Sequence, residues 1–164
     1  MEFDCRILGA RGKTVRRDGD KQEIYYETEK KKLKAILEKP VPWREISEIG
    51  PGVSGIGRYE TSFFLSDAWR SGTQLSIDFG HIWGTISAAV NGVELPVLNQ
   101  ISPCVDISAL VHPGENRLAV RTASTLGNRM IADGRIRENA QILKEEHTKQ
   151  LDYGLLDVVF YTKA

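Results

Sequence analysis

The stretch that decides the fold is residues 87–98, SAAVNGVELPVL. Two apolar runs flank Asn91-Gly92, the dipeptide that most readily takes positive φ at both central positions of a two-residue hairpin turn. The apolar residues after the turn recur at alternate positions: Val93, Leu95 and Val97. Before the turn, Ile86, Ala88 and Val90 share one face of the expected strand. The stretch therefore predicts a β-hairpin with one face toward a core.

Period-two patterns and turn signals recur on both sides of this hairpin, and each predicts a further strand. The clearest is QLSIDFG at 74–80, where Leu75, Ile77 and Phe79 alternate with polar residues. The expected strands are 2–8, 21–29, 58–65, 74–80, 83–90, 93–98, 104–108, 117–123 and 154–162. Short strands at this spacing predict an all-β fold, an antiparallel jelly-roll β-sandwich of eight or nine strands.

Helix signals are few. Within EKKKLKAILEK at 29–39, the apolar residues Leu33, Ile36 and Leu37 fall on one helical face, and prolines follow at once. We therefore expect short helical pieces near 31–38, 43–48 and 136–147. No linker or internal repeat divides the chain, which predicts one domain over 1–164, with the polar segment 131–150 as a surface excursion.

The bulk composition excludes several classes of protein. The chain has 164 residues with 22 basic and 22 acidic side chains, and this balance argues against a nucleic-acid partner, because such binding rests on neutralising phosphates. No run reaches the roughly 18–20 apolar residues needed to cross a bilayer, so we expect no membrane partner. The N-terminal residues show no apolar core of signal-peptide length. A cytoplasmic chain and a domain of a longer, secreted protein both stay open.

Cysteine and histidine are too sparse for a disulfide framework or a metal centre. Cys5 and Cys104 allow at most one bridge, and we expect two free thiols. The three histidines are scattered and lack ligand spacing: His81, His112 and His147. The sequence also has no phosphate-binding loop and no nucleophile elbow. We therefore expect no metal site and no cofactor.

Several motifs occur in a specific order. VSGIGRYETSFFL at 53–65 precedes LSIDFGHIWGTISAAVNGVELP at 75–96, which precedes VDISALVHPGENRLAVRTASTLGNRM at 105–130, and YGLL follows at 153–156. This order resembles the galactose-binding-like jelly roll that serves glycoside hydrolases as a sugar-binding or accessory domain. Within that group it looks most like the C-terminal sandwich of bacterial α-L-rhamnosidase-like enzymes. The resemblance covers residues 41–161 and implies a carbohydrate, or a glycoside hydrolase catalytic domain, as the partner.

Two features depart from that pattern. The resemblance implies Gly-Pro after YGLL, and Asp157-Val158 stands there instead. The segment 131–150 is also longer than the corresponding connection in those relatives. Both departures lie near the C-terminal end of the chain.

Three polar residues are expected to build turns rather than bind a ligand. Asn91 belongs to the hairpin, Asn116 follows the Pro113-Gly114 turn, and Asp106 precedes the short turn at 108–110. Asparagine and aspartate side chains hydrogen-bond nearby backbone groups at such places. We therefore assign these three residues to the scaffold.

Sugar binding needs an aromatic face for a pyranose ring and a few polar groups for its hydroxyls. Trp83 is the best candidate, since it lies opposite the expected core face of its strand and next to the His81 turn. Trp43 and Trp69 are expected to pack against the core. Further candidates are Asn128 and Arg129, after the expected bend at Gly127, and Tyr153. For Trp83 the alternative is core packing, and for Arg129 it is an ion pair that pins the loop.

The sequence thus supports two readings of different kinds. The first is a non-catalytic carbohydrate-binding or accessory module of a glycoside hydrolase. The second is a purely structural or protein-interaction sandwich without a sugar ligand. A small complete hydrolase is disfavoured, because glycoside cleavage needs two carboxyls roughly 5–10 Å apart, one with a raised pKa. The acidic residues lie mainly in turns or alternate out of strands, and no pair stands in an apolar setting.

The isolated chain is therefore expected to hydrolyse no aryl glycoside above the uncatalysed background. Release of nitrophenol from a panel of nitrophenyl glycosides measures this directly. A turnover that disappears when a single Asp or Glu is replaced by its amide would contradict the expectation.

Overall fold

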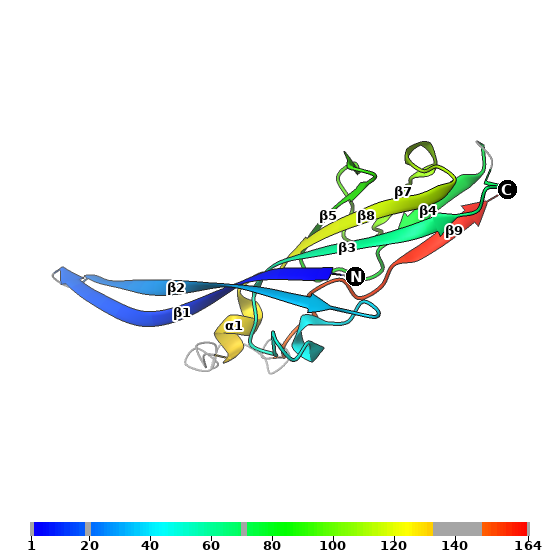
Figure 1. Ribbon diagram of the computed structural model, residues 1–164. Coiled ribbons are helices and arrows are strands. Elements are labelled where there is room, and N and C mark those ends of the chain that lie inside the picture. The colour runs from blue at the N-terminus through cyan, green and yellow to red at the C-terminus, as the bar shows by residue number, and fades with distance from the viewer. Residues whose placement is uncertain (1, 19–20, 70–71, 133–148, 164) are drawn as a thin grey trace.

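The computed structural model describes residues 2–18, 21–69, 72–132 and 149–163, with the backbone alone for 2–18 and 21–32. It is a mostly β structure with two antiparallel sheets and short helical pieces, as predicted (Figure 1). The larger sheet has the strand order β2-β1-β3-β8-β5-β6, and the smaller has the order β7-β4-β9. The strands are β1 (Glu2–Asp18), β2 (Lys21–Ile36), β3 (Gly55–Leu65), β4 (Gln74–Asp78), β5 (Thr85–Val90), β6 (Val93–Glu94), β7 (Cys104–Asp106), β8 (Gly114–Ala123) and β9 (Val159–Lys163).

The predicted hairpin joins β5 and β6. Asn91 and Gly92 both have positive φ, at 50° and 83°, and Val90 pairs with Val93 across the turn. The inward positions of β5 are the predicted ones, since Ala88 and Val90 are buried. β6 is shorter than predicted and ends at Glu94, because Pro96 has no N–H to donate to a ladder.

The core lies between the two sheets and comes from the alternating apolar residues. β4 contributes Leu75 and Ile77, with Phe79 just beyond its end, and all three are buried. The larger sheet contributes buried residues from β3, β5 and β8: Tyr59, Ala88, Val90, Leu118 and Val120. Period-two alternation in the sequence thus identified the inner faces of both sheets.

A hydrogen-bonded group around Tyr59 ties the later part of the chain to β3. The indole Nε1–H of Trp43 donates to the Tyr59 hydroxyl at 2.7 Å, and the backbone N–H of Leu155 donates to the same oxygen at 2.9 Å. Gly154 has φ +116°, and a Cβ built there would lie 2.6 Å from Cδ1 of Trp43. Glycine is therefore required at this close approach, and Trp43 packs the core as predicted.

The three polar residues assigned to the scaffold build turns. The buried Asn116 accepts hydrogen bonds from the Asn91 side chain at 2.8 Å and from the backbone N–H of His112 at 3.0 Å. Its own amide donates to the carbonyl oxygen of His112 at 2.7 Å. Hydrogen bonds from the hydroxyl and the backbone N–H of Ser108 lower the pKa of Asp106, which holds the turn after β7.

The helix predicted near 31–38 is wrong. β2 continues to Ile36, and its residues pair one by one with β1. Burial there has period two, since Ala35 is buried and its neighbours Lys34 and Ile36 are exposed. The apolar pattern of residues 29–39 fits both the helix period and the strand period. Pairing with β1 selected the strand.

The other helical predictions have different outcomes. A single 3₁₀ turn, η1 (Trp43–Glu45), begins after Pro42, which confirms a short helical piece near 43–48. A second 3₁₀ turn, η2 (Ser108–Leu110), follows β7. The helix expected near 136–147 lies outside the described residues. A helix that the sequence did not predict, α1 (Gly127–Ala132), follows β8.

β1 and β2 form a long ribbon, and a short part of it joins the sandwich. Residues Glu2–Ile7 pair with Glu60–Gly55 of β3. From Leu8 onward, β1 pairs with β2 alone among the described strands, and this part of the ribbon projects away from the sandwich (Figure 1). Cys104 on β7 is a free, exposed thiol. The described part of the chain contains no helix long and apolar enough to span a membrane.

Replacement of Gly92 by valine is expected to destabilise the protein by about 1–2 kcal/mol, the cost of a left-handed conformation for a residue with a side chain. A Cβ at Gly92 would meet no atom within 4 Å, so the loss reports backbone strain alone. Urea denaturation measures it. Ser87→Val is the control, because this exposed residue lies in the middle of β5, and a change within about 0.5 kcal/mol is expected there. Equal stability of the two variants would contradict the assigned turn.

Candidate functional site

An exposed aromatic pair stands at one end of the sandwich. The rings of His81 and Trp83 are edge to face, with centroids 4.5 Å apart and planes at 68°. Trp83 is 43% exposed, and His81 is also exposed. The two rings are thus in contact, and Trp83 lies outside the core.

The loop that carries this pair is held on both sides. Phe79 and Ile82 are buried, so residues within and just before the loop anchor it in the core. The backbone N–H of Gly80 donates to Oδ1 of Asp78 at 2.9 Å. Gly84 has φ +151°, and a Cβ built there would lie 2.2 Å from the carbonyl oxygen of Ala123. The loop therefore lies directly against the end of β8, and glycine is required at that contact.

Trp83 precedes β5 instead of beginning it. The prediction placed Trp83 as the first residue of a strand over 83–90, but the ladder begins at Thr85. Thr85 pairs with Ala123, the last residue of β8, so the ladder has no earlier partner there. The carbonyl oxygen of Gly84 accepts a hydrogen bond from the side chain of Gln100. A short, fixed loop thus presents the indole.

Asp157 lies beside the same loop. A Cβ built on Gly80 would lie 3.1 Å from the Cβ of Asp157, and Asp157 is exposed. One of its carboxylate oxygens accepts the N–H of Val158 at 2.8 Å. Sequence reasoning did not place Asp157 in the site. The available signal was its departure from the Gly-Pro that the family resemblance implies.

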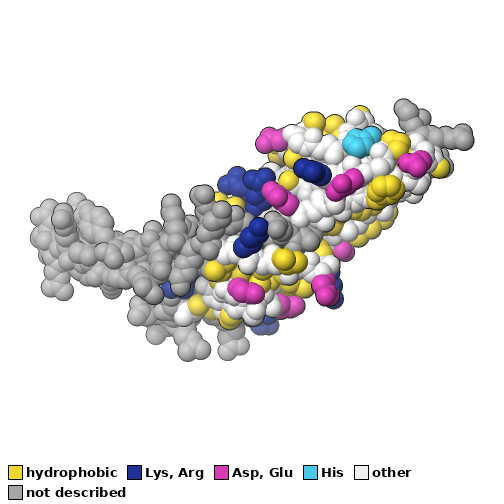
Figure 2. All heavy atoms as spheres, viewed as in Figure 1, with side chains coloured by type: hydrophobic (Ala, Val, Ile, Leu, Met, Phe, Trp, Pro, Cys, Tyr) yellow, Lys and Arg dark blue, Asp and Glu magenta, His cyan; other side chains and the backbone are white. Residues whose placement is uncertain are grey.

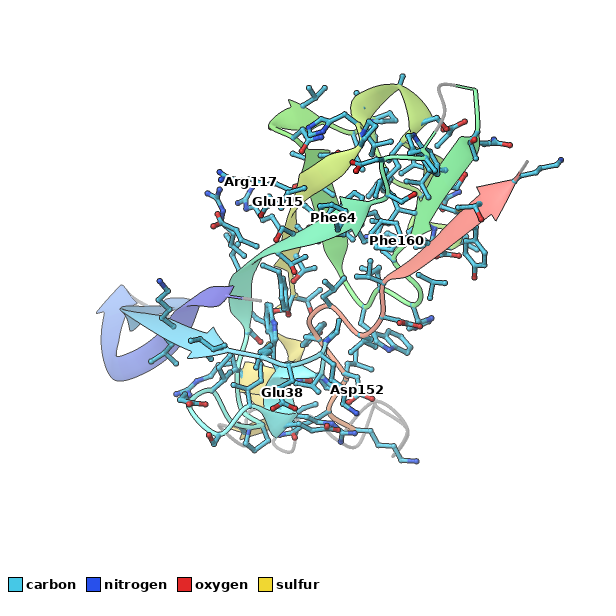
Figure 3. The ribbon with its side chains drawn as sticks, turned by 45° about the vertical axis from the view of Figure 1, so that its right-hand side comes forward. Glu38, Phe64, Glu115, Arg117, Asp152 and Phe160 are labelled. Carbon is cyan, nitrogen blue, oxygen red and sulfur yellow. The ribbon has the colours of Figure 1, made fainter. Side chains whose placement is uncertain are left out.

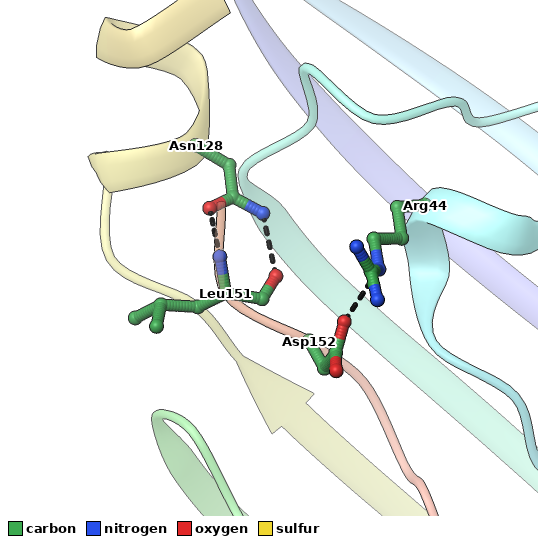
Figure 4. A network of polar contacts seen from close by, with 4 residues as sticks. All are labelled: Arg44, Asn128, Leu151 and Asp152. Carbon is green, nitrogen blue, oxygen red and sulfur yellow. Dashed lines mark hydrogen bonds and ion pairs between the residues drawn. The ribbon is translucent and has the colours of Figure 1, made fainter. Parts of the chain in front are cut away.

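Asn128 is buried and fully engaged with the backbone (Figure 4). Its Nδ2 donates to the carbonyl oxygen of Leu151 at 2.8 Å, and its Oδ1 accepts the N–H of Leu151 at 2.8 Å. This arrangement copies a backbone pair and fixes the C-terminal segment to α1. Nearby, Nε of Arg44 and Oδ1 of Asp152 form an ion pair at 2.5 Å, which holds the next residue of that segment.

Tyr153 and Arg129 also lie where α1 meets the C-terminal segment. Tyr153 is buried, and its hydroxyl is 2.5 Å from Oγ1 of Thr125. Its ring lies 6.4 Å from that of Trp43. Arg129 is half-buried within α1, and its backbone N–H donates to Oγ of Ser54 at 3.3 Å.

The five candidate residues therefore fall into two groups. His81 and Trp83 form an exposed pair, whereas Asn128, Arg129 and Tyr153 lie where α1 meets the C-terminal segment. The bend expected at Gly127 is instead the start of α1, so Asn128 and Arg129 lie on a helix. In the described structure, Asn128 and Tyr153 use their polar groups for internal contacts.

A shallow groove lies elsewhere, on the outer face of the larger sheet. Small residues such as Ala89 and Ala119 form its floor, and charged residues from β3, β6 and β8 line it. Nη2 of Arg58 and Oε1 of Glu60 form an ion pair at 2.8 Å in this lining. The described residues of the lining include no tryptophan, tyrosine or phenylalanine, so the groove lacks a broad stacking surface for a sugar ring. Figure 2 shows both signs of charge interspersed with apolar side chains on the visible face.

Comparisons with known proteins support the fold. No family model matches the sequence, and no curated protein gives a significant match. A rhamnosidase from Novosphingobium sp. PP1Y contains a similar structure, with a TM-score of 0.60 and 23% identity over 80% of this chain. A β-glycosidase from Bacteroides vulgatus matches 98% of this chain at 15% identity with a TM-score of 0.48. A Ruminococcus gnavus β-glucuronidase matches 57% at 23% identity with a TM-score of 0.46.

The chain spans a small part of each of these enzymes. It covers 13% of the rhamnosidase, 19% of the β-glycosidase and 16% of the β-glucuronidase. At these identities the likeness shows the fold alone, and the similar part is a small portion of a much larger enzyme. The expected resemblance is thus shown as structural similarity to a domain of a glycoside hydrolase.

Trp83→Ala is expected to cost less than about 1.5 kcal/mol of unfolding free energy, because the side chain is 43% exposed and lies outside the core. Trp43→Ala is the matched control, since that indole is buried and hydrogen-bonded to Tyr59. There the cost should reach the roughly 3–5 kcal/mol typical of a core aromatic. Chemical denaturation compares the two. A loss at Trp83 as large as at Trp43 would make Trp83 a core residue and remove it as a site.

Proposed function

We propose that this chain is a non-catalytic accessory domain of a glycoside hydrolase and that the His81–Trp83 pair is its carbohydrate-binding surface. The observation that carries the proposal is the exposed indole of Trp83, fixed on a short loop and flanked edge to face by His81. The similarity of the fold to a domain within a rhamnosidase supports the accessory role.

The chemistry of the pair suits a sugar ring. A pyranose presents C–H groups on one face, and these pack against the negative face of an indole. The imidazole nitrogens of His81 and the carboxylate of Asp157, beside the same loop, are able to bond hydroxyls at the ring edge. Because one aromatic platform on an open surface buries little of a ligand, affinity in the millimolar range is expected, about 4 kcal/mol.

Two exposed acidic residues, Glu48 and Asp106, lack the setting of a general acid. A general acid for glycoside cleavage needs a raised pKa. Hydrogen bonds from neighbouring serines instead lower the pKa of Glu48 and of Asp106, through Ser47 and Ser108 respectively.

Titration of the ¹⁵N-labelled chain with sugars tests the proposal. L-rhamnose, D-galactose, D-glucuronic acid and a rhamnose-containing polysaccharide are added separately, and the three indole N–H resonances are followed by NMR. The Trp83 resonance is expected to shift with at least one sugar, while that of the buried Trp43 stays fixed. Trp83→Ala should abolish the remaining shifts around the loop, and Val97→Ala, at an exposed apolar residue elsewhere, should preserve them.

A Trp83 resonance that no sugar moves, in a chain that is folded, would refute carbohydrate binding at this pair. The second reading from the sequence, a protein-interaction sandwich, would then account for the exposed indole. In that case the His81–Trp83 pair would be a contact for the catalytic domain.

A further inference from the structure

The turn between β5 and β6 is also a place of chemical reactivity. In an Asn-Gly sequence, the backbone nitrogen of the glycine can attack the side-chain carbonyl carbon of the asparagine, because glycine has no Cβ to obstruct the approach. Asn91 is the one asparagine in the sequence that glycine follows. Gly92 is exposed, and a Cβ built there would meet no atom within 4 Å. The hairpin turn thus contains the asparagine whose sequence most favours deamidation.

The side-chain amide of Asn91 is held at both of its polar atoms. Its Nδ2 donates to the carbonyl oxygen of Leu110 at 2.8 Å and to Oδ1 of Asn116 at 2.8 Å. Its Oδ1 accepts the backbone N–H of Arg117 at 2.8 Å. Both N–H donors of the amide are therefore engaged. The side chain cannot rotate freely toward the nitrogen of Gly92 without breaking these bonds.

These bonds tie Asn91 to β8. The backbone N–H of Asn91 donates to the carbonyl oxygen of Arg117 at 2.9 Å, while its Oδ1 accepts the N–H of the same residue. The pairing of β5 with β8 thus continues one residue beyond Val90, with a side-chain oxygen in place of a backbone carbonyl. Figure 3 shows Arg117 on β8 together with Glu115. Because β6 takes no part in these bonds, fraying of that two-residue strand leaves Asn91 held.

The surroundings of Asn91 accept an amide and reject a carboxylate. Oδ1 of the buried Asn116 also accepts the backbone N–H of His112 at 3.0 Å. Nδ2 of Asn116 donates to the carbonyl oxygens of His112 and Gly114, at 2.7 Å and 3.2 Å. Asn116 therefore cannot turn its amide round without losing all of these bonds. An aspartate at position 91 would place a carboxylate oxygen against two acceptors, Oδ1 of Asn116 and the carbonyl oxygen of Leu110.

We propose that Asn91-Gly92 is a deamidation site that folding closes, and that its products destabilise the fold. In the opened turn, the Gly92 nitrogen bonds to Cγ of Asn91, the Cγ–Nδ2 bond breaks, and ammonia leaves with the proton of the attacking nitrogen. Water then opens the succinimide ring at either carbonyl, which gives aspartate or isoaspartate. Isoaspartate carries the backbone through Cβ and Cγ, so it lengthens the main chain of the turn. Neither product fits the hydrogen bonds that hold Asn91.

This inference goes beyond the accessory role and is independent of the carbohydrate site. The bonds of Asn91 run to residues 110–117, whereas His81 and Trp83 lie on the loop before β5. Each unfolding event exposes the turn to an irreversible reaction, and the product is less able to refold. The frequency of opening therefore sets the lifetime of the folded chain.

Incubation of the full chain at mildly alkaline pH tests the closed state. Folded protein and protein unfolded in guanidinium chloride are kept at the same pH and temperature, and proteolysis with mass spectrometry follows the conversion of each asparagine. Conversion at Asn91 should be at least about tenfold slower in the folded chain, because it requires opening of the hydrogen-bonded turn. The exposed Asn99, which Gln100 follows, is the internal reference. In the unfolded chain Asn91 should convert faster than Asn99.

Equal rates at Asn91 in the folded and unfolded chains would overturn the proposal. An unfolded chain in which Asn91 converts no faster than Asn99 would overturn it as well.

Asn91→Asp tests the effect of the product. The melting temperature should fall by about 4 °C or more, because the new carboxylate faces two acceptors. Asn99→Asp is the matched control, since it makes the same change of charge at an exposed residue. Oδ1 of Asn99 accepts the N–H of Ile101 at 2.9 Å, a bond that aspartate retains, and a change within about 1 °C is expected. Equal melting temperatures of the two variants would contradict the destabilising effect. The rate comparison in the natural sequence holds whether or not Asn91→Asp folds.

Discussion

The hydroxyl of Tyr59 accepts two hydrogen bonds inside the core, from the indole of Trp43 and from the backbone N–H of Leu155. Tyr59 lies on β3, while its two partners come from segments before β3 and after α1. Each bond is buried, so its loss would leave an unpaired donor in an apolar setting, at a cost of about 1–3 kcal/mol. The path of the chain on both sides of the sandwich therefore depends on this oxygen.

The C-terminal segment is positioned by the same constraint. The backbone carbonyl of Tyr153 accepts the N–H of Trp43 at 2.8 Å, and Gly154 leaves room for the indole against the backbone. Asn128 pairs with Leu151 from the other side. With 151–155 fixed in this way, Asp157 reaches the His81–Trp83 loop, and β9 reaches β4. The buried polar residues thus position the C-terminal segment, and with it the surface residue Asp157.

Two surfaces of the molecule differ in physical character. The His81–Trp83 pair is a small aromatic platform on a short loop. The outer groove of the larger sheet is lined by small and charged residues, and its described lining contains no indole or phenyl face.

The sequence by itself determined the features that depend on local physics. Alternation of apolar residues specified the inner faces of β3, β4, β5 and β8, since a strand directs successive side chains to opposite faces. Turn chemistry specified the Asn91-Gly92 hairpin and the roles of Asn116 and Asp106. Trp83 is exposed as expected, but because it lies on the loop before β5 and not on a face of that strand. Tertiary structure decided what depends on distant partners. Pairing with β1 made residues 33–36 a strand, because short apolar patterns fit both helix and strand periods. The backbone of Leu151 holds the Asn128 side chain in the interior. No local pattern encodes these contacts, because each joins segments far apart in the sequence.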